Sequence, residues 1–369
     1  MSRALRFLGP ALEDLDANGR LRRPVVGRDP RLQGIDLASN DYLGFASEPL
    51  PSDVRGGAGA SALVLGYHDA HLEAERALAA WIGAESVLLF SSGYAANVGV
   101  LSALGSAEDL IVSDALNHAS IVDGCRLARA ATRVTPHLDV ASVERVLAAE
   151  GSRHRRRIVV VESYYSMDGD GPDLAALRAV CDQHDAILVV DEAHALGVFG
   201  PRGRGRCAEA GIEPDVRVGP LGKAFGLGGA FVAGSQLLRT WLWNAARSFV
   251  FSTALSPAVA AAVPARVAAL AAADDRRARI LEVSSALRAA VAEVSGDVRS
   301  FGPIVPWILG SDSAATVRAS ALQAAGVIAV AIRPPTVPRG TARIRLVGRA
   351  SLTDSEVTRA VALIRAPLP

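Results

Sequence analysis

The sequence predicts an α/β protein that has a large, mainly parallel sheet covered by helices and a smaller C-terminal α+β domain. Short β-branched runs alternate with longer helical patterns, at 86–90, 110–112, 157–162, 186–191, 216–219 and 230–234. Runs this continuously apolar are typical of strands buried on both faces. After a wholly helical stretch, strand-like runs recur at 304–310, 327–332 and 342–347. We therefore expect an N-terminal arm over 1–45, a large domain over 46–245 and a small domain over 246–369.

Composition and charge argue against several classes of function. The 369 residues are 50% hydrophobic and carry 39 basic and 38 acidic side chains, for a formal net charge of +1. That balance gives no electrostatic reason to expect nucleic acid or an anionic membrane as a partner. Three cysteines without a CxxC pair are typical of a reducing compartment, and neither a signal peptide nor a membrane span is evident. We expect a cytoplasmic protein.

Polar clusters follow four of the predicted strands. They are Ser92 with Gly93, Asp114 to His118, Ser166, and Asp191 with His194. In an open α/β sheet, ligands bind beyond the carboxyl ends of the strands. The sequence therefore predicts one binding crevice that several strand ends form together.

Lys223 lies among five glycines in GPLGKAFGLGG, residues 219–229. Such neighbours weaken a helix and give a surface lysine no advantage. Asp191 ends the apolar run of VVDEAHALG, where a buried carboxylate needs a cationic partner. FSSGYAAN (90–97) runs from a strand into a helix whose first amides can bind a phosphate.

These features together suggest a pyridoxal phosphate site. Lys223 can form a Schiff base with the cofactor's aldehyde, and glycines leave room for the ring close to the backbone. Asp191 would pair with the pyridine nitrogen and keep it protonated, so that the ring can act as an electron sink. His118 could stack on the face of the ring.

Three alternatives have weaker support. The DEAH letters occur in helicases, but a Walker A loop needs Gly at 217 and Ser or Thr at 224, where this chain has Arg217 and Ala224. A dinucleotide fingerprint in GLGGAF would need glycine in place of Phe231. His68 and His71 have helical spacing for a metal pair, but no third ligand is evident, so we expect no metal site.

The motifs named above, with SDALNHASIVDG, SYYSMDGD and LASNDYLG (37–44), make the sequence similar to the α-oxoamine synthases over nearly its whole length. These fold-type-I pyridoxal-phosphate enzymes condense an amino acid with an acyl thioester. IRPPTVPRGTARIR (332–345) most resembles the biotin-pathway branch, which uses L-alanine and a pimeloyl thioester of coenzyme A or an acyl carrier protein. The resemblance also implies a homodimer with active sites at its interface.

The resemblance implies a role for each matching residue. Lys223 would hold the cofactor and remove the Cα proton, Asp191 would face the pyridine nitrogen, and His118 would stack on the ring. His194 and Ser166 would lie near the phenolic oxygen of the cofactor. The backbone of Gly93 and Tyr94 would bind its phosphate. Ser252 and Thr253 would reach the phosphate bound by the partner subunit. For the substrates the implied residues are Asn40 and Arg345 at the carboxylate, the arginine as a bidentate clamp, and Arg22 and Thr336 at the acyl group.

Two departures from the family pattern bear on cofactor and substrate binding. Pro220 stands where the family usually has a phosphate-binding threonine, and it offers neither a hydroxyl nor an amide proton. The loop 57–66 is about two residues shorter than the usual glycine-rich segment. Two other hypotheses therefore stay open: a synthase that uses glycine or serine with another acyl thioester, and a non-catalytic relative that binds pyridoxal phosphate.

Overall fold

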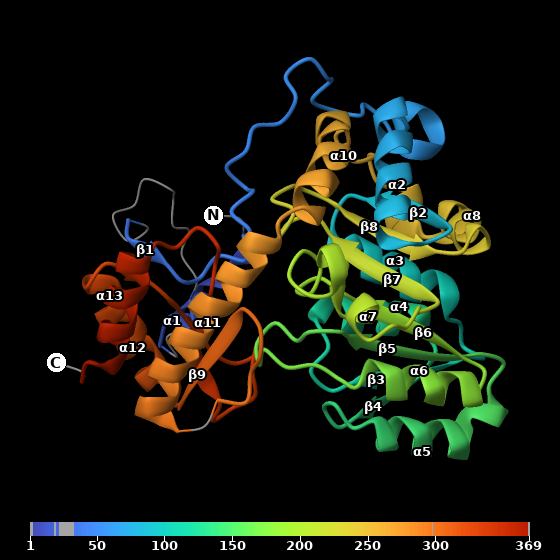
Figure 1. Cartoon of the computed structure of the whole chain (residues 1–369). Coiled ribbons are helices and arrows are strands. Elements are labelled where there is room, and N and C mark those ends of the chain that lie inside the picture. Colours follow the sequence, from blue (N-terminus) through green and yellow to red (C-terminus); the bar gives the residue numbers. More distant parts are fainter. Residues whose placement is uncertain (1–2, 18–19, 22–32, 297, 368–369) are drawn as a thin grey trace.

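The computed structural model describes residues 3–17, 20–21, 33–296 and 298–367, which form two bodies (Figure 1). The large body is built on a seven-stranded sheet of order β2-β8-β7-β6-β5-β3-β4, in which only β8 runs against the others. Its strands are β2 Ser86–Phe90, β3 Leu110–Asp114, β4 Ala131–Thr135, β5 Arg157–Glu162, β6 Ala186–Asp191, β7 Val216–Pro220 and β8 Ala230–Gly234. The predicted fold class, a mainly parallel sheet in an α/β protein, is confirmed.

Helices connect the strands and cover the sheet. They are α2 Asp69–Ile82, α3 Gly93–Leu104, α4 Ala119–Ala128, α5 Val140–Glu150, α6 Leu174–Gln183, α7 Gly205–Glu209, α8 Gln236–Ala245, α9 Arg247–Val250 and α10 Pro257–Ala271. The side chains of Ser92, Asp139, Asp173 and Ser235 cap four of them by accepting a hydrogen bond from a first-turn amide. Such caps satisfy amides that have no acceptor within the helix, and they define where the chain leaves a strand.

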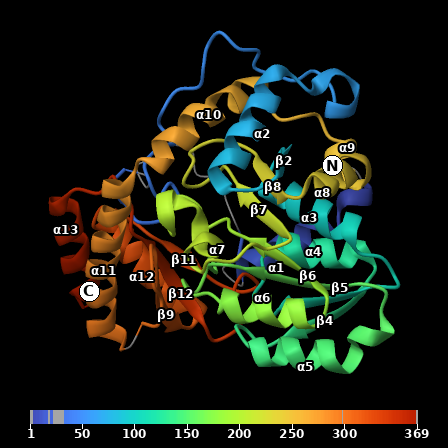
Figure 2. The same ribbon diagram turned by 45° about the vertical axis from the view of Figure 1, so that its right-hand side comes forward.

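The small body is built on a three-stranded antiparallel sheet, which Figure 2 shows beside α11 and α12. Its elements are α11 Asp274–Ser295, β9 Ile304–Gly310, α12 Asp312–Ala324, β11 Val330–Ile332, β12 Ala342–Val347 and α13 Asp354–Arg365. Near the N-terminus, α1 spans Leu8–Ala17, and β1 (Ile35–Asp36) pairs with β10 (Val327–Ile328). Because α10 packs on α2 while α11 packs on α13 and β9, the chain passes between the bodies near residue 272. The domain limits given above stay predictions.

Two segments differ from their expected pattern. The apolar run 327–332 is divided between two sheets, because β10 pairs with β1 and β11 pairs with β12. The edge strand β4 was not predicted, because its sequence ATRVT contains the polar residues Thr132 and Arg133 in place of a continuous apolar run. A strand at a sheet edge has one unpaired side and partly exposed faces, so it lacks the pattern of a fully buried strand.

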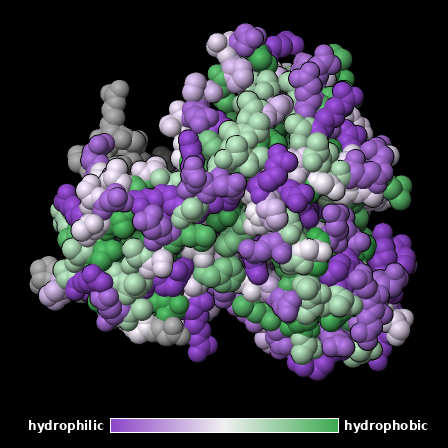
Figure 3. Space-filling view, in the orientation of Figure 1, coloured by the Kyte–Doolittle hydropathy of each residue, from purple (hydrophilic) through white to green (hydrophobic). Residues whose placement is uncertain are grey.

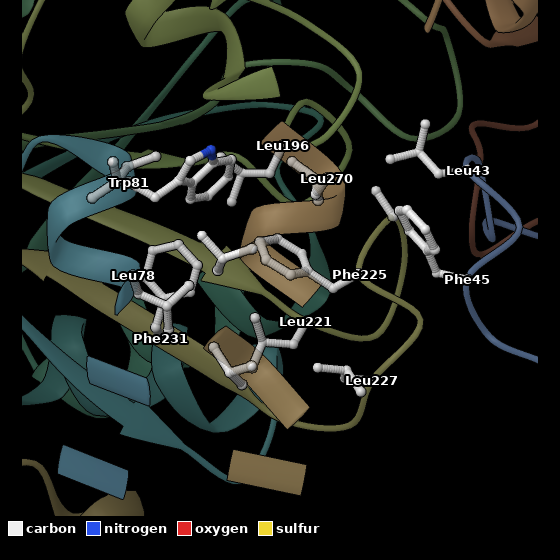
Figure 4. Close-up of a cluster of buried hydrophobic side chains, with 14 of the residues drawn as sticks. Leu43, Phe45, Leu78, Trp81, Leu196, Leu221, Phe225, Leu227, Phe231 and Leu270 are labelled. Atoms are coloured by element: carbon white, nitrogen blue, oxygen red, sulfur yellow. The ribbon is translucent and has the colours of Figure 1, made fainter. Parts of the chain in front are cut away.

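A buried cluster between α2, α10 and the β7–β8 connection holds the lysine loop in place (Figure 4). Leu221, Phe225 and Leu227 flank Lys223 in sequence and are almost fully buried. The Phe225 ring packs edge-on against Trp81 of α2, with 5.5 Å between the ring centroids. Removing such a side chain typically lowers the free energy of unfolding by about 3–5 kcal/mol. The hydrophobic core thus positions the backbone that carries Lys223.

Two glycines of the lysine loop are required by the packing of the protein itself. A Cβ on Gly226, whose φ is +63°, would lie 2.4 Å from backbone atoms of Phe45 and Ala46. A Cβ on Gly219 would lie 2.3 Å from the Phe231 ring. Real Cβ atoms do not approach other atoms this closely, and a positive φ strains any residue with a side chain. Close contact with the protein therefore explains these glycines without reference to a ligand.

No single helix among the described residues is long and apolar enough to cross a membrane, although α10 and α11 meet that test as a pair bent by 68°. Both helices have faces buried in the protein, α10 against α2 and α11 against α13. On the face shown in Figure 3, hydrophilic side chains predominate and hydrophobic ones occur in small groups between them.

We predict that G226A destabilises the protein and G228A does not. At Gly226 an added Cβ meets backbone, whereas at Gly228 nothing lies within 4 Å and φ is not in the left-handed region. Strain of this kind is worth about 1–3 kcal/mol, and alanine at a permissive glycine is neutral or slightly stabilising. Thermal unfolding of both variants measures the difference; equal unfolding temperatures would contradict the packing explanation.

Candidate active site

The candidate site lies at the carboxyl ends of β5, β6 and β7. Glu162 and Asp191 end the neighbouring strands β5 and β6 and are register partners. Lys223 follows β7 in the connection to β8, and both carboxylates act on its charge. The carboxylates are 3% and 4% exposed. Three ionisable groups are thus held together in a largely buried place, as predicted for Asp191 and Lys223.

Asp191 is held by neutral donors. Asn97 donates from Nδ2 to Asp191 Oδ2 at 2.7 Å, and the amide of Ala193 donates to Oδ1 at 2.8 Å. Asn97 Nδ2 also lies 2.9 Å from Ser120 Oγ, which is 2.8 Å from His118 Nδ1. One hydrogen-bonded network therefore connects the predicted ring-facing carboxylate with the predicted stacking histidine. No arginine or lysine pairs with Asp191 in the part of the chain described here.

The surroundings of Lys223 favour the neutral form of its amine. Burial lowers its pKa, and Arg345 acts in the same direction, while Asp191 and Glu162 oppose the shift. The ammonium makes no hydrogen bond or ion pair within the described residues. A lysine with a lowered pKa has a larger share of free amine at neutral pH, which is the form that attacks carbonyl carbon.

The start of α3 provides open amides for an anion. Ser92 caps the helix by accepting from the amide of Ala95 at 3.1 Å, so Gly93 and Tyr94 occupy the first helical positions, whose amides have no acceptor within the helix. A Cβ on Gly93 would lie 2.6 Å from Pro220 Cγ. Pro220 therefore packs directly against the predicted phosphate seat. Tyr94 is 47% exposed, and its hydroxyl donates to Asp123.

Arg345 contacts both Asn40 and the loop after β5. Arg345 Nη2 donates to Asn40 Oδ1 at 2.8 Å, and its Nε donates to the carbonyl oxygen of Ser166. Arg345 belongs to β12 of the small body, whereas Ser166 belongs to the loop after β5 of the large body. The structure thus brings together three predicted site residues, with Ser166 taking part through its backbone.

His194 is buried beside Tyr42. The Tyr42 hydroxyl lies 2.6 Å from His194 Nδ1, and the side chains are T-shaped to one another. Burial lowers the pKa of His194 well below its usual value, and the positive charges of Lys223 and Arg345 add to this effect. Burial likewise lowers the pKa of His118. Both histidines are therefore neutral imidazoles at neutral pH.

The remaining predicted residues lie apart from this centre. Thr336 is exposed in the segment after β11, where its amide donates to the carbonyl of Arg333 at 3.1 Å. Ser252 and Thr253 follow α9, and Thr253 forms an isolated bridge with Ser61. No contact joins these three residues to Lys223 or Asp191 in the described chain. Arg22 lies outside the described residues.

His68 and His71 make structural contacts at the start of α2. Nε2 of His71 lies 2.7 Å from the carbonyl of Leu255, and its Nδ1 accepts from the amide of His68. These contacts fix the start of α2. No group of three metal-binding side chains occurs among the described residues.

Sequence reasoning missed Glu162, Asn97, Ser120 and Tyr42. Burial and the neighbouring Asp191 raise the pKa of Glu162 to about 8, and its Oε1 accepts from the His118 amide at 2.7 Å. One signal for Glu162 was available, because two adjacent parallel strands both end in an acid, RIVVVE and AILVVD. The contacts of the other three residues depend on the folded chain.

Several known proteins are similar to this chain in sequence and in architecture. A family model described as aminotransferase class I and II matches residues 33–364. The chain belongs to this family. The 8-amino-7-oxononanoate synthase of Anaeromyxobacter dehalogenans is 43% identical over 386 residues, covering 99% of this chain and 96% of that protein. The enzyme of the same name from Mycolicibacterium smegmatis is 45% identical over 363 residues, covering 95% and 94%.

The structural match extends over both bodies. Sphingomonas wittichii serine palmitoyltransferase superposes with a TM-score of 0.90 at 30% identity, covering 98% of this chain and 96% of that one. Within the aminotransferase family, the chain is therefore an α-oxoamine synthase and a pyridoxal-phosphate-dependent acyltransferase, as its motifs predicted. The residues present fit the cofactor: a lysine without a partner, a buried carboxylate held only by neutral donors, and open amides at the start of α3.

His137 joins the polar loops around the site. Its Nδ1 lies 2.8 Å from Asp114 Oδ1, and its Nε2 lies 3.2 Å from Asp170 Oδ1. Burial disfavours the charged imidazole, but the hydrogen bonds and charges of the two carboxylates outweigh burial and raise the pKa of His137 to about 10. The charged histidine, in the loop after β4, therefore joins the end of β3 to the loop after β5.

We predict that H137N lowers stability in a pH-dependent way. Because the pKa is about 10 in the folded state and about 6.5 in the unfolded chain, the stabilisation is complete below pH 6.5 and is lost as pH rises to 10. The difference in unfolding temperature between wild type and H137N should be largest at pH 6 and vanish near pH 10. H154N is the control, since His154 makes no ion pair in the described chain. A difference that does not vary with pH would refute the ion-pair explanation.

Proposed function

We propose that this protein catalyses the decarboxylative condensation of L-alanine with a pimeloyl thioester, a step of biotin biosynthesis. The products are 8-amino-7-oxononanoate, CO2 and the free thiol of the acyl carrier. The observation that carries the proposal is the joint presence of the Lys223–Asp191 centre and the Asn40–Arg345 pair in a chain 43–45% identical to synthases of this name. A cytoplasmic location goes with this proposal and stays a prediction.

Lys223 and Asp191 would have separate roles in activating the amino-acid substrate. Lys223 would hold pyridoxal phosphate, which when bound supplies an electron sink for the charge released at Cα. The neutral Lys223 amine, once free, would take the Cα proton. Asp191 would stabilise a positive charge at the pyridine nitrogen, and Asn97 and the Ala193 amide keep this carboxylate oriented.

The substrate carboxylate would bind at Arg345. A guanidinium can hold a carboxylate through two parallel hydrogen bonds, and Asn40 keeps this guanidinium oriented through its 2.8 Å contact. Binding there would hold the amino acid in place while the Lys223 amine takes its Cα proton. His118 would lie on the ring face, with its backbone held by Glu162. Ser166 and His194 would border the phenolic oxygen.

The acyl thioester would enter past the small body. Thr336 and Arg22 are the residues proposed for its recognition, on the evidence of the family pattern alone. Coenzyme A and an acyl carrier protein both remain candidates for the carrier. Thr336 is exposed, so it is accessible to a substrate that arrives from solvent.

A homodimer is also part of the proposal. Exposed apolar side chains surround the Ser252–Thr253 segment: Val64 and Leu65 on the turn Ala62–Gly66, and Phe251 beside Ser252, each more than two-thirds exposed. Ser61 bridges Thr253, so these side chains belong to one region of the surface. Large apolar side chains exposed together are typical of an interface. We infer that this surface faces a second copy, whose phosphate seat Ser252 and Thr253 would approach.

We predict that the purified protein with pyridoxal phosphate forms 8-amino-7-oxononanoate from L-alanine and pimeloyl-CoA, detected by mass spectrometry, and that K223A forms none. The amine is both the cofactor's attachment and the base, so its loss removes about 10⁴-fold or more of activity. The control is R145K, because Arg145 is an exposed side chain on α5, away from the centre, so this variant should retain turnover. Normal turnover by K223A would sink the assignment.

The same assay decides among substrates. Glycine and L-serine, each with acyl-CoA of several chain lengths, are tested beside L-alanine. Product from L-serine and a long-chain acyl-CoA alone would favour the activity named for the Sphingomonas relative. Cofactor binding without product from any pair would favour the non-catalytic hypothesis.

We predict that the dimer interface completes the site. V64D with L65D should yield monomers by light scattering and weaken cofactor binding, because two charges would be buried in an apolar contact. L237D is the control, since Leu237 is 80% exposed but lies on α8, away from Ser252. Monomeric wild-type protein in light scattering would contradict the proposal.

A further inference from the structure

Tyr42 and His194 make a buried contact that none of the roles above explains. Tyr42 follows β1 in the segment LASNDYLG and is completely buried, and His194 is 6% exposed. Their 2.6 Å contact joins the Tyr42 hydroxyl to His194 Nδ1. No other hydrogen bond of His194 is found in the described chain. Nδ1 is therefore engaged by the protein, and Nε2 is left to the interior of the site.

The contacts of Tyr42 indicate where its single hydroxyl proton points. The hydroxyl has two nearby acceptors, His194 Nδ1 at 2.6 Å and Asn40 Oδ1 at 3.5 Å. Asn40 Oδ1 already accepts a hydrogen bond from Arg345 at 2.8 Å. The shorter distance and the unoccupied acceptor both favour donation to His194.

A neutral imidazole carries one ring proton, so an accepting Nδ1 leaves that proton on Nε2. His194 is neutral because burial, Lys223 and Arg345 all lower its pKa. Burial raises the pKa of Tyr42 to about 12, so the phenol keeps its proton over the whole range in which the protein would work. The donor that fixes the tautomer is thus present at every relevant pH.

We propose that Tyr42 is a positioning residue that holds His194 as the Nε2–H tautomer, so that His194 presents a hydrogen-bond donor to the bound cofactor. The proposal rests on the cofactor-facing position proposed for His194. The opposite tautomer would place a bare lone pair against the cofactor's phenolic oxygen, which is itself an acceptor, and would repel it. Tyr42 would thereby influence the cofactor indirectly, through its hydrogen bond to His194.

Tyr42 also lies next to the carboxylate-binding pair. Its hydroxyl is near Asn40, which orients Arg345, so one phenol borders both the cofactor side and the amino-acid side of the site. A variant without the hydroxyl isolates this function, because the edge-on packing of the Tyr42 ring on His194, at 6.2 Å between centroids, does not need the oxygen.

The test compares Y42F with Y164F. Tyr164 is equally buried, but its hydroxyl bonds to the backbone of Phe301 and Ile304, so Y164F controls for losing a buried hydroxyl. Two properties of the cofactor complex are measured without substrates: the dissociation constant of pyridoxal phosphate, and the pH midpoint of its visible absorbance. We expect Y42F to weaken binding about tenfold, the loss expected for one hydrogen bond, and to move the midpoint. Y164F should change neither.

A double-mutant cycle shows whether the effect passes through His194. Glutamine at 194 places an amide donor near the position of Nε2 and cannot respond to Tyr42 through Nδ1. Y42F should therefore add nothing in an H194Q background. Full additivity, or a Y42F complex that matches Y164F in both properties, would overturn the proposal.

The wild-type protein offers a test that needs no variant of Tyr42. The chain has seven histidines, and ¹⁵N-labelled imidazole spectra of the cofactor complex, with H194Q for assignment, identify the protonated nitrogen of His194. Protonated Nε2 supports the proposal, and protonated Nδ1 refutes it. None of these tests uses L-alanine or a thioester. A failure of the proposed reaction can therefore be distinguished from a failure of this proposal.

Discussion

Two carboxylates, Glu162 and Asp191, lie side by side in the interior at the ends of neighbouring strands, and the site depends on how their charge is balanced. Both are nearly inaccessible to water, and neither pairs with an arginine in the described chain. Isolated buried charges are costly, and burial together with the neighbouring Asp191 raises the pKa of Glu162 to about 8, which favours its neutral form at pH 7. Asp191 has only neutral hydrogen-bond donors and no cationic partner within the described residues. The protonated pyridine ring of the cofactor would supply that cation, in keeping with the role proposed for Asp191.

The small body contributes the opposite charge. Arg343 and Arg345 of β12 are both nearly buried, and both reach into the loop after β5: Arg343 Nη1 lies 2.6 Å from Asp168 Oδ1 and 3.0 Å from the carbonyl of Met167, and Arg345 bonds to the carbonyl of Ser166. Alternate residues of one strand therefore fasten the two bodies together. Arg343 is paired with a carboxylate by this contact, whereas the partners of Arg345 within the described chain are neutral oxygens, so its charge could serve an anion. A change in how the bodies pack would move Arg345, the group proposed to bind the substrate carboxylate.

Much of this arrangement was predictable because it depends on local patterns. Buried strands such as 157–162 and 186–191 are continuous apolar runs, and the rule that ligands lie at strand ends brings Asp191, His118 and Lys223 to one place. The contacts that orient these groups were not predictable, because they join distant segments: Tyr42 to His194 across 152 positions, and Asn40 to Arg345 across 305. No local pattern reports such pairs. The sequence pattern suggests that the glycines around Lys223 leave room for the cofactor ring. Two of them are instead explained by crowding against Phe45 and Phe231, which only the fold reveals.

Pro220 is best understood together with Gly93. The proline ring fills the space that a Cβ at 93 would need, so the two residues form one surface beneath the start of α3, and a hydroxyl is absent from it. An anion placed there would rely on the open amides of Gly93 and Tyr94 and on whatever a second copy supplies. In the proposed dimer, fewer donors from its own chain would make the contribution of Ser252 and Thr253 from the second copy proportionally larger. Cofactor affinity and dimerisation would then be coupled more tightly in this protein than in family members with threonine at this position.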